Sequence, residues 1–215
     1  MLFRSRIDDF DDLFHPELIL RAVSQTLEGL GLDLFENPNL FFEIENSPLK
    51  NNDALCVAVD IPHEIHIIMQ PVGGLLDLET LLHEVGHAAF LSSVDPSLPI
   101  EYRRLYRSSS LDESFAFLFM GLAENPIWLT KIVRMNKDKA ETLSKLANTK
   151  RLCLIRRYIG KFLAEKEYFE KQDLKDSSFY CHFLEKATGF EHEPEGYLID
   201  METDFYSLDY VMGWS

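Results

Sequence analysis

Apolar residues recur at intervals of three and four along most of the chain, the spacing that places them on one face of a helix. Residues 16–30 are the first segment with this pattern. Pro16 suits the first turn of a helix, and Gly29 and Gly31 indicate where the helix ends. This helix carries no chemical signature, so we assign it to packing. Helical spacing also predicts two or three helices over residues 127–171. Further helices are expected over the basic and aromatic residues 101–107, over residues 115–122, which are apolar all round, over residues 173–188 and in the last turns before residue 214.

Runs with strand character fall between residues 40 and 70. Residues 40–45 are a candidate strand. Residues 54–61 and 64–70 are β-branched and apolar and flank Pro62, which is typical of a β-hairpin. We therefore predict a mainly α fold with a small antiparallel sheet or hairpin beside a buried helix. The edge of this hairpin could align an extended peptide by main-chain hydrogen bonding, or the hairpin could only support the helix.

The buried helix contains the sequence His-Glu-Val-Gly-His at residues 83–87, and Asp77 is expected to cap it. Positions i and i+4 share a helix face, so His83 and His87 can offer two imidazole nitrogens to one metal ion. Glu84 is turned by about 100° from His83, where its carboxylate can take a proton from a metal-activated water. Gly86 has no side chain, so another element can approach the helix closely there.

A third ligand is needed, because a catalytic zinc keeps three protein ligands and one open position. Glu113 lies 26 residues after His87 (113 − 87), at the start of an apolar segment expected to form a core helix. Ser110 and Glu113 also match a helix capping box, but Ser109 and Asp112 offer almost the same cap and leave Glu113 available. Two histidines at this spacing can also be an ordinary exposed pair. Their apolar neighbours favour a buried pair that needs partners, and we predict one Zn²⁺ bound by both histidines and Glu113.

These motifs resemble the zinc peptidases of the thimet oligopeptidase and oligoendopeptidase F family, which are of the gluzincin type. The likeness is carried by the zinc helix at residues 83–88 and by Asp-Glu-Ser-Phe-Ala at residues 112–116. The approach to the helix, residues 70–74, and the segment Phe-Tyr-Ser-Leu-Asp-Tyr-Val-Met-Gly at residues 205–213 are similar to the same family. The resemblance covers about residues 54–215 and implies a zincin-like metallopeptidase catalytic domain.

The resemblance also implies roles for single residues. Glu84 would be the general base, and Tyr206 and Tyr210 fall where the family places tyrosines that stabilise the transition state. The family has a histidine shortly before those tyrosines. In this sequence the matching place is near Asp200, and the nearest histidine is His192.

The family also carries a large helical region ahead of its zinc helix, whereas only 82 residues precede His83 here. We therefore expect a single catalytic domain over residues 1–215 that is the core of a longer family pattern and cleaves peptides weakly. Within it, residues 1–53 would hold the first helix and strand, residues 54–125 the hairpin and the zinc helices, and residues 126–215 the helical remainder.

Composition narrows the classes of partner. The chain is 46% hydrophobic and 27% charged, which is typical of a globular protein. Its 36 acidic against 21 basic residues give a net charge of −15, which disfavours nucleic acid or an anionic membrane as a partner. Three scattered cysteines and the lack of a secretory signal or a long apolar run favour a cytoplasmic protein.

We therefore predict a zinc-dependent peptidase that hydrolyses peptide bonds in oligopeptides. One alternative is a zinc carboxypeptidase of related geometry, in which Arg103 or Arg104 would bind the free carboxylate of the substrate. Another is an inactive, metal-bound scaffold that docks a partner. The residues that select the substrate are not predicted by the sequence.

Overall fold

A computed structural model of the chain describes residues 7–32, 35–45, 47, 50, 54–103, 108–172 and 175–215. The fold is mainly helical with one small three-stranded sheet. The chain divides into two compact units. The first comprises residues 1–107 and 115–148, and the second comprises residues 108–114 and 149–215, so that the helices α5 and α7 each contribute residues to both.

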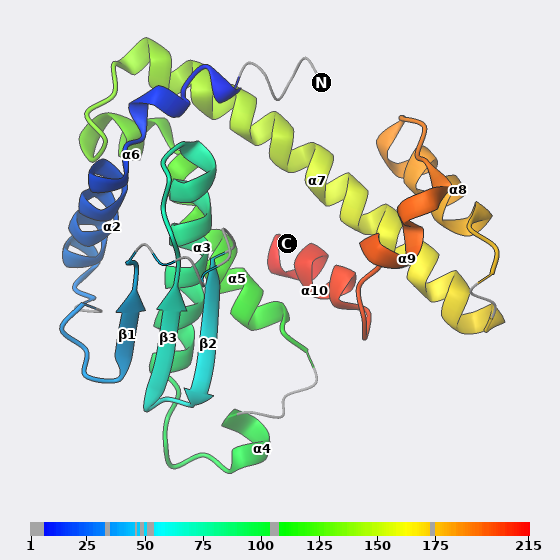
Figure 1. Cartoon of the computed structure of the whole chain (residues 1–215), viewed down its shortest axis with the longest axis horizontal. Helices are drawn as coiled ribbons and strands as arrows, with labels where there is room; N and C mark the ends of the chain where they lie inside the picture. The colour runs from blue at the N-terminus through cyan, green and yellow to red at the C-terminus, as the bar shows by residue number, and fades with distance from the viewer. Residues whose placement is uncertain are drawn as a thin grey trace. The chain divides into compact units, whose positions relative to one another are not determined.

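Figure 1 labels the α-helices and strands, several of which match the expected ranges closely. Those up to residue 131 are η1 (Asp11–Leu13), α2 (Pro16–Leu30), β1 (Leu40–Glu43), β2 (Leu55–Asp60), β3 (Glu64–Ile68), α3 (Leu75–Ser92), α4 (Ile100–Arg103), α5 (Ser110–Met120), η2 (Gly121–Glu124) and α6 (Pro126–Lys131). Those that follow are α7 (Lys137–Lys171), α8 (Ser178–Thr188), η3 (Pro194–Gly196), α9 (Tyr197–Asp200) and α10 (Tyr206–Gly213).

The first helix, α2, begins and ends as its sequence predicts. Pro16 occupies its first turn, and Gly31 adopts a left-handed conformation with φ of 71° at its end. The amide of Leu32 then donates to the carbonyl of Leu27 at 2.9 Å. This hydrogen bond satisfies a carbonyl that the end of the helix would otherwise leave unpaired.

The sheet has the strand order β1-β3-β2 and is mixed (Figure 1). The predicted hairpin is confirmed, because β2 and β3 pair antiparallel with Cys56 opposite Ile67. The prediction of an antiparallel sheet is wrong for β1, which runs parallel to β3 with Leu40 opposite Ile65. Residues 44–63 separate these two strands, which is long enough for the crossover that parallel neighbours require. The most buried strand, β3, thereby becomes the central one.

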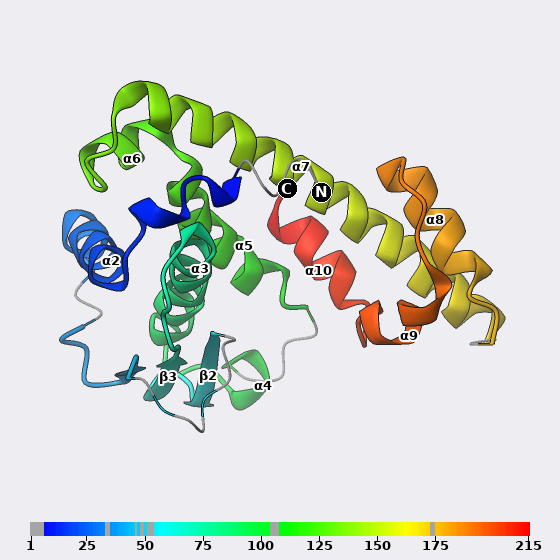
Figure 2. The same ribbon diagram turned by 45° about the horizontal axis from the view of Figure 1, so that its top comes forward.

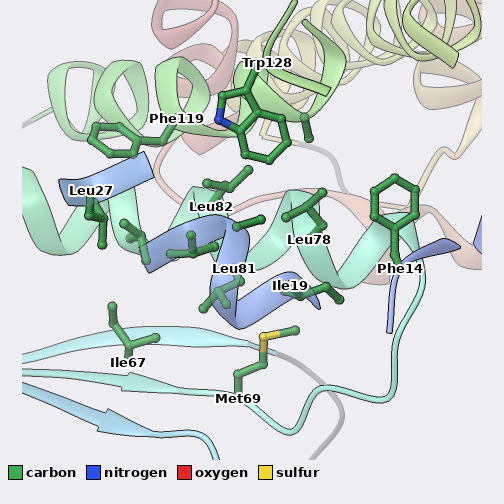
Figure 3. Packing of buried hydrophobic residues seen from close by; sticks show 14 of the residues in the cluster. Phe14, Ile19, Leu27, Ile67, Met69, Leu78, Leu81, Leu82, Phe119 and Trp128 are labelled. Carbon is green, nitrogen blue, oxygen red and sulfur yellow. The ribbon is translucent and has the colours of Figure 1, made fainter. Parts of the chain in front are cut away.

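The helix α3 is buried on more than one side, which explains why its sequence is apolar almost all round. Figure 3 shows Leu78, Leu81 and Leu82 of α3 between Ile67 of β3 on one side and two aromatic side chains, Phe119 and Trp128, on the other. All three leucines are at most 1% exposed. Complete burial of one such side chain stabilises a fold by about 1.5–3 kcal/mol. This packing holds the predicted zinc helix rigidly in the first unit.

The cap of α3 differs from the prediction. The helix starts at Leu75, so Asp77 lies inside its first turn and does not cap it. The carboxylate of Asp77 accepts hydrogen bonds from the amides of Val72 and Gly73, at 2.6 and 2.8 Å, and so fixes the loop before the helix. The first helical amide, that of Leu75, instead donates to Asp11 Oδ1 at 2.8 Å. An acidic side chain at this end also complements the helix dipole.

The long region after residue 126 forms two helices, within the predicted two or three. Asn136 marks the break, because its side chain accepts a hydrogen bond from the amide of Asp138 at 2.9 Å and caps α7. In the second unit, α8 lies along the later part of α7 (Figure 2). A Cβ at Gly160 would lie 3.1 Å from the Cα of Leu184, which shows how closely these helices approach. In the part of the chain that is described, no helix has both the length and the apolar character needed to cross a membrane.

Candidate metal centre

The two histidines of α3 are arranged as a pair of metal ligands. Their Nε2 atoms lie 3.2 Å apart, and their rings meet edge to face with centroids 4.7 Å apart. Two nitrogens bound at about 2.0–2.1 Å to a tetrahedral zinc would be about 3.3 Å apart. The spacing of His83 and His87 therefore already suits one zinc ion.

The environment of His83 also suits metal binding. Burial and, to a smaller extent, the neighbouring His87 together lower the pKa of His83 to about 3. At neutral pH the imidazole of His83 is therefore neutral and keeps a lone pair for a metal. The ring of Phe117 lies against it with centroids 5.0 Å apart and limits its rotation.

The carboxylate of Glu84 follows His83 on α3 and is buried, with 8% of the residue exposed. As consecutive residues, the two side chains differ by about 100° around the helix axis. Glu84 therefore lies beside the pair of imidazole nitrogens and not in line with them. The role of Glu84 as a proton acceptor stays a prediction, now made for a buried carboxylate.

The third predicted ligand, Glu113, lies near the start of α5, and its approach to α3 depends on Gly86. A Cβ added at Gly86 would lie 2.6 Å from both the Cα of Ala116 and the carbonyl oxygen of Phe115. The predicted close approach at Gly86 is therefore confirmed, and the element that approaches is α5. Glu113 precedes Ala116 by three residues on the same helix and is 1% exposed.

His83, His87 and Glu113 each offer a ligand atom, and these atoms lie within 4.8 Å of one another. Among the described residues, no other group of three or more histidine, cysteine, aspartate or glutamate side chains is placed to share one metal ion. Two imidazoles and one carboxylate are a donor set that zinc takes in hydrolytic sites, where a fourth position stays open for water or substrate. The residues present therefore fit a zinc ion in number, chemistry and spacing.

The predicted catalytic tyrosines both lie on α10, in the second unit. The hydroxyl of Tyr206 donates a hydrogen bond to Glu113 Oε1 at 2.6 Å. Burial, and then this bond to a carboxylate, raise the pKa of Tyr206 far above its usual range, so it stays protonated. The ring of Tyr210 packs edge to face on that of Tyr206, with centroids 5.0 Å apart, and also contacts Tyr158.

Near Asp200, where the resemblance would imply a histidine, the second unit has a charged network. Asp200 accepts hydrogen bonds from Arg157 and from the hydroxyl of Tyr180, the latter at 2.7 Å. Although burial alone would raise it, the pKa of Asp200 is lowered by these two donors. His192 lies elsewhere in the same unit, with its Nε2 3.0 Å from the hydroxyl of Thr188. Both residues thus have structural partners.

Of the two arginines proposed for a carboxypeptidase, Arg104 lies outside the described residues. Arg103 donates from Nη1 to the carbonyl oxygen of Ile61 at 2.7 Å and from Nε to that of Leu98 at 2.9 Å. The bond to Ile61 ties α4 to the turn between β2 and β3, and the bond to Leu98 holds the loop before α4. The guanidinium of Arg103 is therefore engaged by the main chain of its own unit.

One residue that the sequence analysis did not single out is Asp209. Its Oδ1 accepts hydrogen bonds from the hydroxyls of Ser108 and Ser110, both at 2.7 Å, and its Oδ2 accepts from the amide of Ser109 at 3.0 Å. Asp209 therefore caps α5 from about a hundred residues away in the sequence. No local pattern near residue 209 signals this role.

In a comparison with known proteins, no family model, no curated protein and no solved structure matches the chain.

Proposed function

We propose that this chain is a zinc-dependent peptidase that hydrolyses peptide bonds in oligopeptides. One observation carries the proposal. Two imidazoles with Nε2 atoms 3.2 Å apart lie near a buried carboxylate, and the three candidate ligand atoms fall within 4.8 Å of one another. When bound, zinc would polarise the scissile carbonyl and lower the pKa of a water toward about 7.

In this proposal, the protein residues divide the work between binding and proton transfer. His83, His87 and Glu113 hold the ion. Glu84, which is not needed as a ligand, accepts a proton from the attacking water and returns it to the leaving amine. Its burial removes competing solvent from the path of that proton.

The substrate is expected to be an extended peptide. The strand β2 is an edge of the sheet, so one side of its main chain has no neighbouring strand among the described residues. Its residues Cys56 and Ala58 face the core that includes α3, whereas Leu55, Val57 and Val59 are exposed. An added peptide strand would gain main-chain hydrogen bonds from this edge.

The carboxypeptidase alternative requires an arginine that binds the free carboxylate of the substrate. Because the guanidinium of Arg103 already donates to two main-chain oxygens, Arg103 does not favour that alternative.

The proposal is tested by metal-dependent cleavage. Purified protein loaded with zinc is expected to cleave members of a quenched oligopeptide library. Removal of the metal with a chelator should abolish the cleavage, and added zinc should restore it. Mass spectrometry of the products separates internal cleavage from removal of C-terminal residues. Cleavage that survives complete removal of metal, or no cleavage by fully zinc-loaded protein, would contradict the proposal.

A further inference from the structure

We propose that Tyr206 is a positioning residue that orients Glu113 for metal binding, and that α10 acts as a clamp on the start of α5. This inference rests on the proposed zinc site. It assigns Tyr206 a role different from the transition-state role that the family resemblance implies.

The first contact is the hydrogen bond from the Tyr206 hydroxyl to Glu113 Oε1, at 2.6 Å. A hydrogen bond to a charged carboxylate is among the stronger ones in proteins, and here the acceptor is 1% exposed. The bond restricts rotation of the carboxylate that supplies the third candidate ligand atom. A ligand fixed in this way reorganises less on binding than a mobile one, so metal affinity rises.

The second contact is made one turn along the same helix. Asp209 follows Tyr206 by three residues, so the two side chains lie on neighbouring parts of one face of α10. Asp209 accepts from two serine hydroxyls and from the amide of Ser109, immediately before α5 begins at Ser110. A carboxylate at this position both satisfies an amide at the start of the helix and complements its dipole. The turn that carries Glu113 is thus held at two points.

The clamp is itself anchored within the second unit. Ser207 is fully buried, and its hydroxyl donates to Glu165 Oε1 on α7 at 2.7 Å. The rings of Tyr210 and Trp214 both pack on Tyr158 of α7, with centroids 4.7 and 5.6 Å apart. The helix α10 therefore presents the Tyr206 hydroxyl to Glu113 from a fixed base.

The hydroxyl of Tyr206 has a single proton, and that proton is donated to Glu113. In this arrangement it has none left to donate to a developing negative charge on the substrate. The oxyanion role predicted for the two tyrosines would then belong to Tyr210 alone.

The test is the zinc affinity of Tyr206→Phe, measured by competition with a chromophoric chelator. We expect binding weaker by about 10- to 100-fold, the usual effect of removing a partner of a metal ligand. Tyr168→Phe is the matched control, because its buried hydroxyl also makes a 2.6 Å hydrogen bond, but to the carbonyl oxygen of Asp176. That variant should bind zinc within about twofold of the wild type, since its acceptor is not a metal ligand.

Cobalt(II) bound in place of zinc provides a second measurement, its visible absorption spectrum. This spectrum reports the geometry of the metal ligands and would not change through a loss of protein stability alone. We expect the visible absorption bands of bound cobalt to change in Tyr206→Phe and to stay as in the wild type in Tyr168→Phe. Unchanged zinc affinity together with an unchanged cobalt spectrum in Tyr206→Phe would overturn the inference. If the wild type bound no zinc, the proposed function would fail, which is a separate result.

A second variant keeps the test decisive if Tyr206→Phe does not fold. Asp209→Asn leaves Tyr206 and Glu113 intact but removes the charge that caps α5. We expect zinc binding to weaken by roughly fivefold, the loss of about one good hydrogen bond. Wild-type affinity in Asp209→Asn would then overturn the clamp.

Discussion

Glu84→Gln is expected to lower peptide hydrolysis by at least about a hundredfold while zinc stays bound. The substitution keeps the size of a side chain that is buried on α3 and removes its ability to accept a proton. The zinc ligands are untouched, so the loss should appear in turnover and not in metal content. The expected size is that of general-base catalysis.

The experiment compares zinc content and cleavage of one quenched peptide in the two proteins. Glu64→Gln makes the same chemical change on the exposed surface of β3 and serves as the control, with turnover expected to stay near that of the wild type. Normal turnover in a fully zinc-loaded Glu84→Gln variant would remove Glu84 from the mechanism.

Gly86→Ala is expected to destabilise the protein by about 3 kcal/mol or more, at the upper end of the cost of overpacking. The added Cβ would lie 2.6 Å from main-chain atoms of Phe115 and Ala116, which cannot rotate away as a side chain could. The helices α3 and α5 would have to separate. Because α5 carries Glu113, the same change should also weaken zinc binding.

Gly29→Ala provides the matched control for this experiment. Gly29 also lies inside a helix, α2, but a Cβ there would meet nothing within 4 Å. Alanine at that position should raise stability by about 0.5–1 kcal/mol, because it restricts the unfolded chain and favours the helix. Unfolding by urea gives both values. A Gly86→Ala variant within about 1 kcal/mol of the wild type would show that α3 and α5 are not packed as described.

Local patterns account for the parts of the fold that the sequence predicts well. The periodic leucines and the flanking Pro16 and Gly31 define α2, because spacing and helix ends depend on neighbouring residues. The pairing of His83 with His87 follows from the helix repeat alone. Gly86, between the two histidines, predicts that another element approaches α3 closely. The sequence does not show that this element is α5, because that contact depends on tertiary packing.

Contacts between distant residues explain what the sequence analysis missed. The prediction that Asp77 caps α3 is wrong, because Asp11, 64 residues before Leu75, accepts the hydrogen bond from the first helical amide. Tertiary folding brings Asp11 to this helix end, and the local sequence does not show it. Asp209 caps α5 in the same way. The parallel pairing of β1 with β3 likewise depends on which strands the core places side by side.

Zinc content is the most direct measure of the central claim, that α3 and α5 together form a metal site. The protein is stripped with a chelator, reloaded with zinc, freed of excess metal and analysed for zinc per chain. We predict about one equivalent in the wild type, as for a three-ligand catalytic site, and none in a His83→Ala, His87→Ala double variant that remains folded. Full retention of zinc by the double variant, or no zinc in the wild type, would contradict the claim.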